Sequence, residues 1–185
     1  MRNGHYVIDT HCHVYPEKIA RRAADNISDF YDGRPHVAGD TATLLSVMEK
    51  NGTDYAIINS AAMSPGQVEP VNSFLLETAA AHPDKLAAVG TVHPECSPTR
   101  MEQVFHWLLD NGFHGIKIHS DMLRIAIDDP RMYGVYNHCR ESGLPVLLHT
   151  GDYRFDFSNP AQLVNVLEKF PDLQVIGTHM GGWSV

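Results

Sequence analysis

Short apolar runs alternate with longer amphipathic segments along this chain. The runs are rich in Val and Ile, as buried strands are, and the segments between them repeat apolar residues at helical spacing. After a longer first interval the runs recur about every 30 residues, which is typical of parallel strands joined by helical crossovers. The predicted strands are Tyr6–Asp9, Tyr55–Asn59, Leu86–Val92, Gly115–Ile118, Pro145–Leu148 and Leu173–Gly177.

The segments between the strands also carry signals for the start of a helix. Asp40 or Thr41 is the expected cap of the helix that ends at Gly52. Three later helices are expected to begin at a capping residue followed by proline, namely at Ser97-Pro98, Asp129-Pro130 and Asn159-Pro160. The long first interval leaves room for an insertion over residues 16–39.

Two architectures fit this order of elements: an open doubly wound sheet and a TIM-type barrel. No Gly-rich phosphate loop follows the first strand, so the usual fingerprint of a dinucleotide-binding sheet is missing. The residues at the strand ends favour the barrel, because active sites of such barrels lie at the carboxyl edge of the strands. Five of the six predicted strands lead into histidine, with His11 and His13 after the first and His93, His119, His149 and His179 after later ones.

The pair His11 and His13 has the spacing of two metal ligands. Residues i and i+2 of a strand point to the same face, about 6.6 Å apart along the chain. One cation with metal–nitrogen bonds of about 2.1 Å could therefore take both imidazoles. The alternative is two polar residues at a strand end without a shared ligand.

His149 follows a wholly apolar strand and His179 precedes a Gly-Gly pair. We expect His149 to be a further metal ligand, and the alternative is a hydrogen-bonded core histidine. An imidazole beside a metal can also act as general acid or base near neutral pH. His179 is a candidate for that role.

Three more residues are expected to line a substrate pocket. Lys117 and His119 share a face of their strand, and a lysine on the inner face must pair with an anion, bind substrate or be modified. A lysine in a salt bridge is the alternative. Arg154 on the following loop could hold a substrate carboxylate through its planar guanidinium, or lie exposed to solvent.

Composition narrows the classes of partner. The net charge of −8, without a run of Lys or Arg, argues against nucleic acid. No apolar stretch approaches the roughly 20 residues that span a bilayer, and no signal-peptide region opens the sequence. We therefore expect a cytoplasmic protein with a small-molecule substrate, and its three scattered cysteines do not indicate disulfides.

Four pieces of sequence carry a family resemblance: "IDTHCHVYP", "GIKIHSD", "LPVLLHTG" and "GTHMGGW", in this order. Together they resemble the amidohydrolase superfamily, in its amidohydrolase-2 branch, which includes aminocarboxymuconate-semialdehyde decarboxylase-like proteins. The resemblance covers the whole chain. It implies a distorted (β/α)8 barrel with a divalent metal, usually zinc, at the strand ends.

The resemblance also implies roles for single residues. It makes His11, His13 and His149 metal ligands and His179 the catalytic histidine, and Lys117 stands where some members carry a carboxylated lysine. Members of the family continue through two more strands to a metal-binding aspartate, whereas this sequence ends at Val185. We therefore expect one partial barrel domain over residues 1–185, with about six strands. Its unpaired edge strands could pair with another copy in a homo-oligomer.

Three functions remain open at this point. The first is a metal-dependent hydrolase that attacks a C–N or C–O bond of a small molecule with metal-activated water. The second is a non-oxidative decarboxylase of an aromatic or unsaturated acid. The third is a truncated metal-binding domain without activity.

Overall fold

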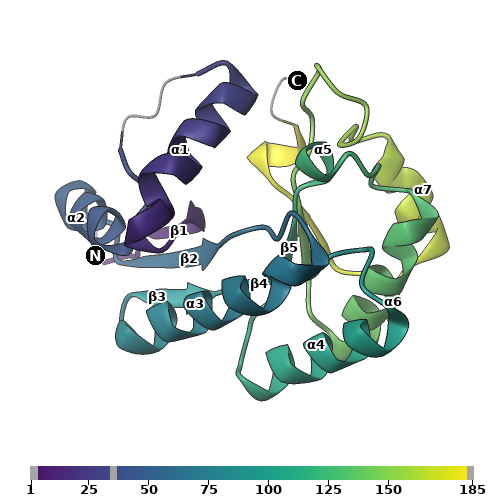
Figure 1. The fold of residues 1–185 in the computed structure, drawn as a ribbon, viewed down its shortest axis with the longest axis horizontal. Helices are drawn as coiled ribbons and strands as arrows, with labels where there is room; N and C mark the ends of the chain where they lie inside the picture. The colour runs from purple at the N-terminus through teal and green to yellow at the C-terminus, as the bar shows by residue number, and fades with distance from the viewer. Residues whose placement is uncertain (1–3, 34–36, 183–185) are drawn as a thin grey trace. The chain divides into compact units, whose positions relative to one another are not determined.

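The computed structural model describes residues 4–33 and 37–182. Helices and strands alternate along these residues, as the sequence predicts (Figure 1). The predicted insertion over residues 16–39 contains helix α1, and its residues 34–36 lie outside the described ranges. The strands are β1 (Ile8–His13), β2 (Tyr55–Asn59), β3 (Leu86–Ala88), β4 (Gly90–Thr91), β5 (Ile116–Ile118), β6 (Val146–Leu148) and β7 (Val175–Gly177).

The described residues also form seven α-helices and three short 3-10 helices. The α-helices are α1 (Glu17–Tyr31), α2 (Thr41–Asn51), α3 (Val68–Ala81), α4 (Pro98–Asp110), α5 (Ser120–Leu123), α6 (Tyr133–Ser142) and α7 (Gln162–Lys169). The 3-10 helices are η1 (Pro65–Gln67), η2 (Pro130–Met132) and η3 (His179–Gly181). None of the helices in the described ranges has the length and apolar character needed to cross a bilayer.

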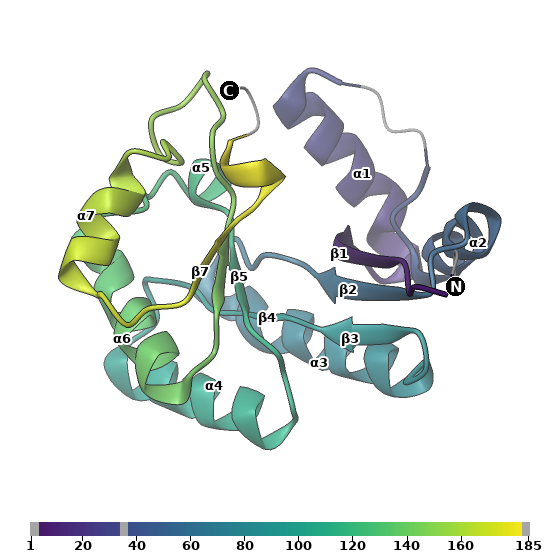
Figure 2. The same ribbon diagram turned by 180° about the vertical axis from the view of Figure 1, so that it is seen from behind.

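Two compact units divide the chain, the first made of residues 1–60 and 73–88 and the second of residues 61–72 and 89–185. In the first unit, β1, β2 and β3 form a parallel sheet in this order, and both views show them side by side (Figures 1 and 2). In the second unit, β4, β5, β6 and β7 form a parallel sheet in chain order. The parallel pairing confirms the predicted helical crossovers.

The prediction of a single strand over Leu86–Val92 is wrong. The segment forms two strands, and β4 pairs with β5 in the second unit. Both backbone groups of Thr91, the last residue of β4, bond to the side chain of Asn72. Thr91 N donates to Asn72 Oδ1 at 2.8 Å, and Asn72 Nδ2 donates to the carbonyl oxygen of Thr91 at 2.9 Å.

The first strand runs later than predicted, over β1 rather than Tyr6–Asp9. It pairs with β2 up to the match of His13 with Asn59, with an irregularity between Asp9 and Cys12. This pairing keeps the chain extended through the histidine pair, which is why the strand includes both residues.

Most of the predicted helix starts are confirmed. The side chains of Asp40, Ser97 and Asp129 each accept a backbone N–H in the first turn that follows them. The last helix begins later than expected, at Gln162. Asn159 still accepts the N–H of Ala161 at 3.0 Å, but this bond closes a turn ahead of α7.

The core of the second unit lies between its sheet and its helices. Figures 1 and 2 both show α4 and α6 lying next to one another, and the rings of Phe105 and His138 stack between these helices with centroids 5.0 Å apart. The strands β5 and β6 are buried along their whole length. This packing fixes the strand ends, where the functional candidates lie.

Candidate active site

Three histidines follow neighbouring strands of the second unit. His119 comes directly after β5, His149 directly after β6, and His179 two residues after β7. Because these strands are parallel and adjacent, their carboxyl ends meet at one edge of the sheet, where α/β enzymes place their active sites. The structure therefore brings these three predicted residues together.

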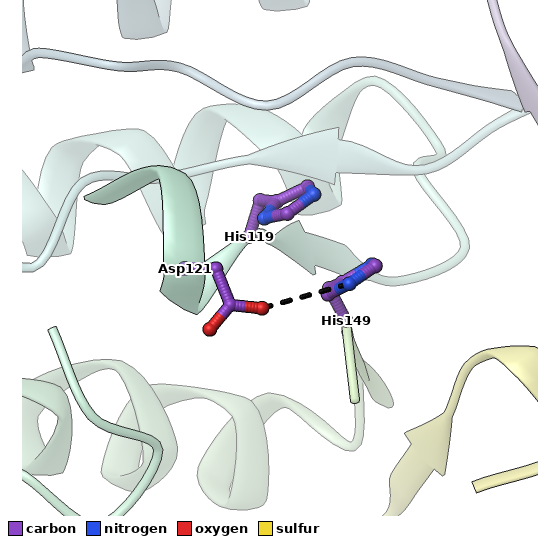
Figure 3. Close-up of side chains that lie close together, drawn as sticks. All are labelled: His119, Asp121 and His149. Atoms are coloured by element: carbon purple, nitrogen blue, oxygen red, sulfur yellow. Dashed lines mark ion pairs between the residues drawn. The ribbon is translucent and has the colours of Figure 1, made fainter. Parts of the chain in front are cut away.

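His149 contacts both of the other histidines. Its ring stacks on that of His119, with centroids 4.0 Å apart and planes 11° from parallel. Nδ1 of His149 lies 3.0 Å from Nε2 of His179, so the two rings share a hydrogen bond whose direction depends on the tautomers. The other ring nitrogen of His149, Nε2, faces Asp121 at 3.6 Å (Figure 3).

Asp121 is a member of this cluster that the sequence analysis missed. Its side chain is fully buried and faces His149, with Ser158 and Arg154 close to its carboxylate. Burial raises the pKa of Asp121 to about 6, although Ser158 and Arg154 partly oppose this shift. The signal in the sequence was its position: Asp121 lies two residues after His119 in "GIKIHSD", at the turn where β5 gives way to α5.

Lys117 on β5 is fully buried, with 0% of its surface exposed. Its Nζ has no hydrogen-bond partner among the described residues, and desolvation lowers its pKa to about 7. Burial, followed by the positive charge of Lys117, lowers the pKa of His179. Lys117 takes part in none of the ion pairs of the described residues. The alternative of a lysine in a salt bridge is therefore not supported.

Two threonines fix the backbone around these histidines. Thr150 Oγ1 donates to the carbonyl oxygen of Thr178 at 2.7 Å, and Thr178 Oγ1 donates to the carbonyl oxygen of Leu148 at 3.0 Å. Immediately after Thr178, His179 and Met180 have left-handed backbones, with φ of 57° and 56°. Such conformations cost free energy in non-glycine residues and cluster at functional sites.

Arg154, a predicted substrate ligand, contacts Asp152 in the structure. Its Nε donates to Asp152 Oδ1 at 3.0 Å and its Nη2 to Asp152 Oδ2 at 2.6 Å. These bonds from Arg154 lower the pKa of Asp152. The pair orders the loop after β6, and a substrate role of Arg154 stays a prediction.

The other predicted ligands, His11 and His13, belong to the first unit. Their ring centroids lie 4.9 Å apart, with the planes tilted by 55°. Nε2 of His11 and Nδ1 of His13 are both shielded from solvent. Two adjacent imidazoles of this kind have donor chemistry that suits a divalent cation, and their role as ligands stays a prediction.

Comparison with protein families gives a match over almost the whole chain. A family described as Amidohydrolase matches residues 8–185. A curated relative, the 2-amino-3-carboxymuconate-6-semialdehyde decarboxylase of Dictyostelium discoideum, is 22% identical over 79 residues. That alignment covers 43% of this chain and 22% of the relative.

Solved structures show the same fold. A TIM-barrel protein of Bordetella bronchiseptica is 20% identical with a TM-score of 0.74, over 97% of this chain and 68% of its own. A 5-carboxyvanillate decarboxylase of Novosphingobium aromaticivorans, solved with bound manganese, is 20% identical with a TM-score of 0.75, over 97% of this chain and 67% of its own. The chain thus spans about two thirds of the length of these structures. Their likeness confirms the predicted TIM-type barrel fold, present here in part.

Proposed function

The chain belongs to the amidohydrolase family, and from this we propose that the whole protein is a metal-dependent, non-oxidative decarboxylase of a small aromatic or unsaturated carboxylic acid. The observation that carries the proposal is the agreement between two kinds of relative. The curated relative and the manganese-bound structure both have decarboxylase names. This agreement favours the decarboxylase over the hydrolase, which the sequence analysis placed first.

The chemistry of the buried strand ends suits a carboxylate substrate. Lys117 is buried without a hydrogen-bond partner among the described residues, so an anion entering the site would gain an interaction that water does not screen. The stacked rings of His119 and His149 provide a flat wall for a planar acid. In this proposal Lys117 and His119 bind and orient the substrate.

A divalent cation would supply Lewis-acid stabilisation of a substrate oxygen as negative charge develops there. The chemistry of imidazole suits such a cation, and in this proposal its donors are His149 of the second unit and the predicted ligands His11 and His13 of the first. Imidazole donors suit zinc, as predicted, whereas manganese, which one similar structure contains, more often takes carboxylate and water ligands. Metal analysis of the purified protein decides between zinc and manganese.

His179 is the proposed proton donor. Decarboxylation breaks the bond between the substrate carbon and its carboxylate carbon, releases carbon dioxide and leaves the electron pair on the substrate carbon. The imidazolium form of His179 then gives a proton to that carbon. Burial and Lys117 lower the pKa of His179, which makes its imidazolium a stronger acid than an ordinary histidine.

The test is an assay of carbon dioxide release. The protein is loaded with Zn²⁺ or Mn²⁺ and incubated with a panel of hydroxybenzoates and unsaturated dicarboxylates. Metal-dependent release of carbon dioxide from at least one acid is expected. Turnover of a panel of esters, amides and lactones without carbon dioxide would favour the hydrolase, and bound metal without any turnover would favour a metal-binding domain without activity. Light scattering of the same sample tests the expected homo-oligomer.

A further inference from the structure

Two buried threonines adjoin the histidines that follow β6 and β7. Thr150 comes directly after His149, and Thr178 comes directly before His179. Only 0% of the surface of Thr150 and 6% of that of Thr178 is exposed. Their hydroxyls are therefore shielded from water and bond to the protein itself.

The two hydroxyls cross between the ends of the strands. Thr150 Oγ1 donates to the carbonyl oxygen of Thr178 at 2.7 Å, and this oxygen belongs to the peptide group that leads into His179. Thr178 Oγ1 donates to the carbonyl oxygen of Leu148 at 3.0 Å, and this oxygen belongs to the peptide group that leads into His149. Each threonine thus holds the peptide group ahead of the histidine that follows the other strand.

We propose that Thr150 and Thr178 are positioning residues for the proposed proton transfer, because their crossed hydroxyl bonds hold the ring of His179 against His149. The inference rests on the proposed function and deepens it, since it names what sets the position of the proton donor. Both threonines act through the two histidines and not on the substrate.

The first argument is the backbone of His179. Its φ of 57° is a left-handed conformation, which costs free energy in a non-glycine residue and persists only where the surrounding structure holds it. The carbonyl oxygen of Thr178, directly ahead of this residue, accepts hydrogen bonds from Thr150 Oγ1 and from Gly181 N, the latter at 3.1 Å. The bond from Gly181 closes the local turn, whereas the bond from Thr150 ties this turn to the end of β6. Without the Thr150 hydroxyl, the turn loses a contact that opposes relaxation of the left-handed backbone.

The second argument is the geometry of the two rings. Nδ1 of His149 lies 3.0 Å from Nε2 of His179, and the ring centroids are 4.7 Å apart with their planes 68° from parallel. Hydrogen bonds weaken steeply when the angle at the donor becomes unfavourable. A change of φ at His179 turns its Cβ to a new direction, so relaxation of the backbone would carry its ring away from His149. The crossed hydroxyls therefore maintain a contact that two other side chains make.

The kinetic test removes the hydroxyl and keeps the shape of the side chain. With the metal-loaded protein and an acid that it decarboxylates, Thr150→Val is expected to lower kcat by about 10- to 100-fold, because displacement of a group by about 1 Å can cost 100-fold. KM should stay nearly unchanged, as for the loss of an interaction that matters only in the transition state. Thr150→Ser keeps the donor and should therefore retain the kcat of the parent.

Tyr136→Phe is the matched control for the loss of a buried hydroxyl bond. Tyr136 is fully buried in the same unit, and its hydroxyl donates to the carbonyl oxygen of Ile127 at 2.6 Å. This variant should lower the thermal midpoint about as much as Thr150→Val and leave kcat unchanged. A similar fall of kcat in both variants, or a Thr150→Ser variant as slow as Thr150→Val, would overturn the proposal.

A spectroscopic measurement without substrate tests the positioning itself. In ¹H–¹⁵N spectra of the imidazole groups, the parent should show a ring N–H proton, protected from exchange, between Nδ1 of His149 and Nε2 of His179. We expect this signal to be lost in Thr150→Val and in Thr178→Val, and kept in Thr150→Ser and Tyr136→Phe. Absence of the signal from the parent, or its retention in both valine variants, would overturn the proposal. If no acid is decarboxylated, the proposed function fails, whereas the ring signal still decides whether the threonines position His179.

Discussion

Nδ1 of His149 lies 3.0 Å from Nε2 of His179, so a hydrogen bond links the residues that follow β6 and β7. One of the two nitrogens must carry the proton of this bond. If Nε2 of His149 binds a cation and His179 is neutral, Nδ1 of His149 carries the proton and donates it to Nε2 of His179. The orientation of the His179 ring then depends on His149, which connects the proposed metal site with the proposed proton donor.

The first prediction concerns the proposed proton donor. We expect His179→Gln to lower kcat for decarboxylation by about 100-fold or more, which is the usual contribution of general acid–base catalysis. Because Gln can still contact His149, Co²⁺ affinity should change by less than about threefold. Steady-state kinetics and calorimetry on the same protein measure the two effects. His106→Gln, at an exposed position of α4, is the matched control. A fall in Co²⁺ affinity as large as the fall in kcat would contradict the assignment of His179 as a proton donor.

The second prediction concerns the stability cost of Lys117. Its pKa is lowered to about 7 in the folded protein by burial, while an unfolded lysine keeps a pKa near 10.4. Between these values the unfolded chain binds more protons, so the free energy of unfolding rises with pH from about 7 to about 10. Lys117→Met should remove this rise and stabilise the protein at pH 7 by on the order of a few kcal/mol.

Urea unfolding at pH 7 and pH 9.5 tests this prediction with the parent and Lys117→Met. Lys85→Met is the control. Because Lys85 is exposed, this substitution should change the free energy of unfolding little at either pH. A parent whose stability is flat over this range would show that Lys117 is neutralised by a partner rather than by deprotonation. The stabilised variant should also lose activity, because Lys117 is proposed to bind the substrate.

Much of the fold could be predicted from the sequence because its signals are local. Apolar runs of strand length, capping side chains and prolines after them mark the elements, and parallel pairing follows from the regular interval between strands. Parallel strands also bring their carboxyl ends to one edge. That is why the order of residues alone suffices to place His119, His149 and His179 near one another.

The remaining features depend on contacts between distant residues. The backbone of Thr91 in β4 bonds to the side chain of Asn72, 19 residues away, and no local pattern reveals this contact. Asp121 lies on a four-residue helix that is too short to give a periodic signal, so its burial against His149 was not foreseen. Arg154 was expected to face a substrate because no local pattern indicates its bidentate pairing with Asp152.

The third prediction compares two Asp-x-Arg pairs with the same bonding pattern. Arg154 binds Asp152, whose side chain is fully buried, whereas Arg131 binds Asp129 in a more exposed setting. Arg154→Met should cost about 1–3 kcal/mol at pH 7, because it leaves a buried carboxylate without two hydrogen bonds. Arg131→Met should cost less than about 1 kcal/mol, as usual for exposed ion pairs.

The pH dependence of this cost has a definite sign. Arg154 lowers the pKa of Asp152 in the folded protein, so the contribution of the pair is complete above the unfolded value of about 3.9. It is lost as the pH falls through the lowered folded value. Denaturant curves at pH 7 and pH 3 should therefore show a smaller difference between parent and Arg154→Met at pH 3. A difference that grows on acidification would contradict the pairing.

The last prediction concerns two glycines, Gly115 and Gly134, whose replacement by alanine should have opposite effects on stability. A Cβ at Gly115 would lie 2.9 Å from the carbonyl oxygen of Pro145 and 3.3 Å from its Cγ, where β5 and β6 begin. Gly115→Ala should therefore destabilise the protein by about 1–3 kcal/mol, as overpacking does. Gly134 lies in α6, and a Cβ there meets no atom within 4 Å, so Gly134→Ala should stabilise by about 0.5–1 kcal/mol. Thermal unfolding of both variants measures the difference, and equal midpoints would show that β5 and β6 approach less closely than the structure describes.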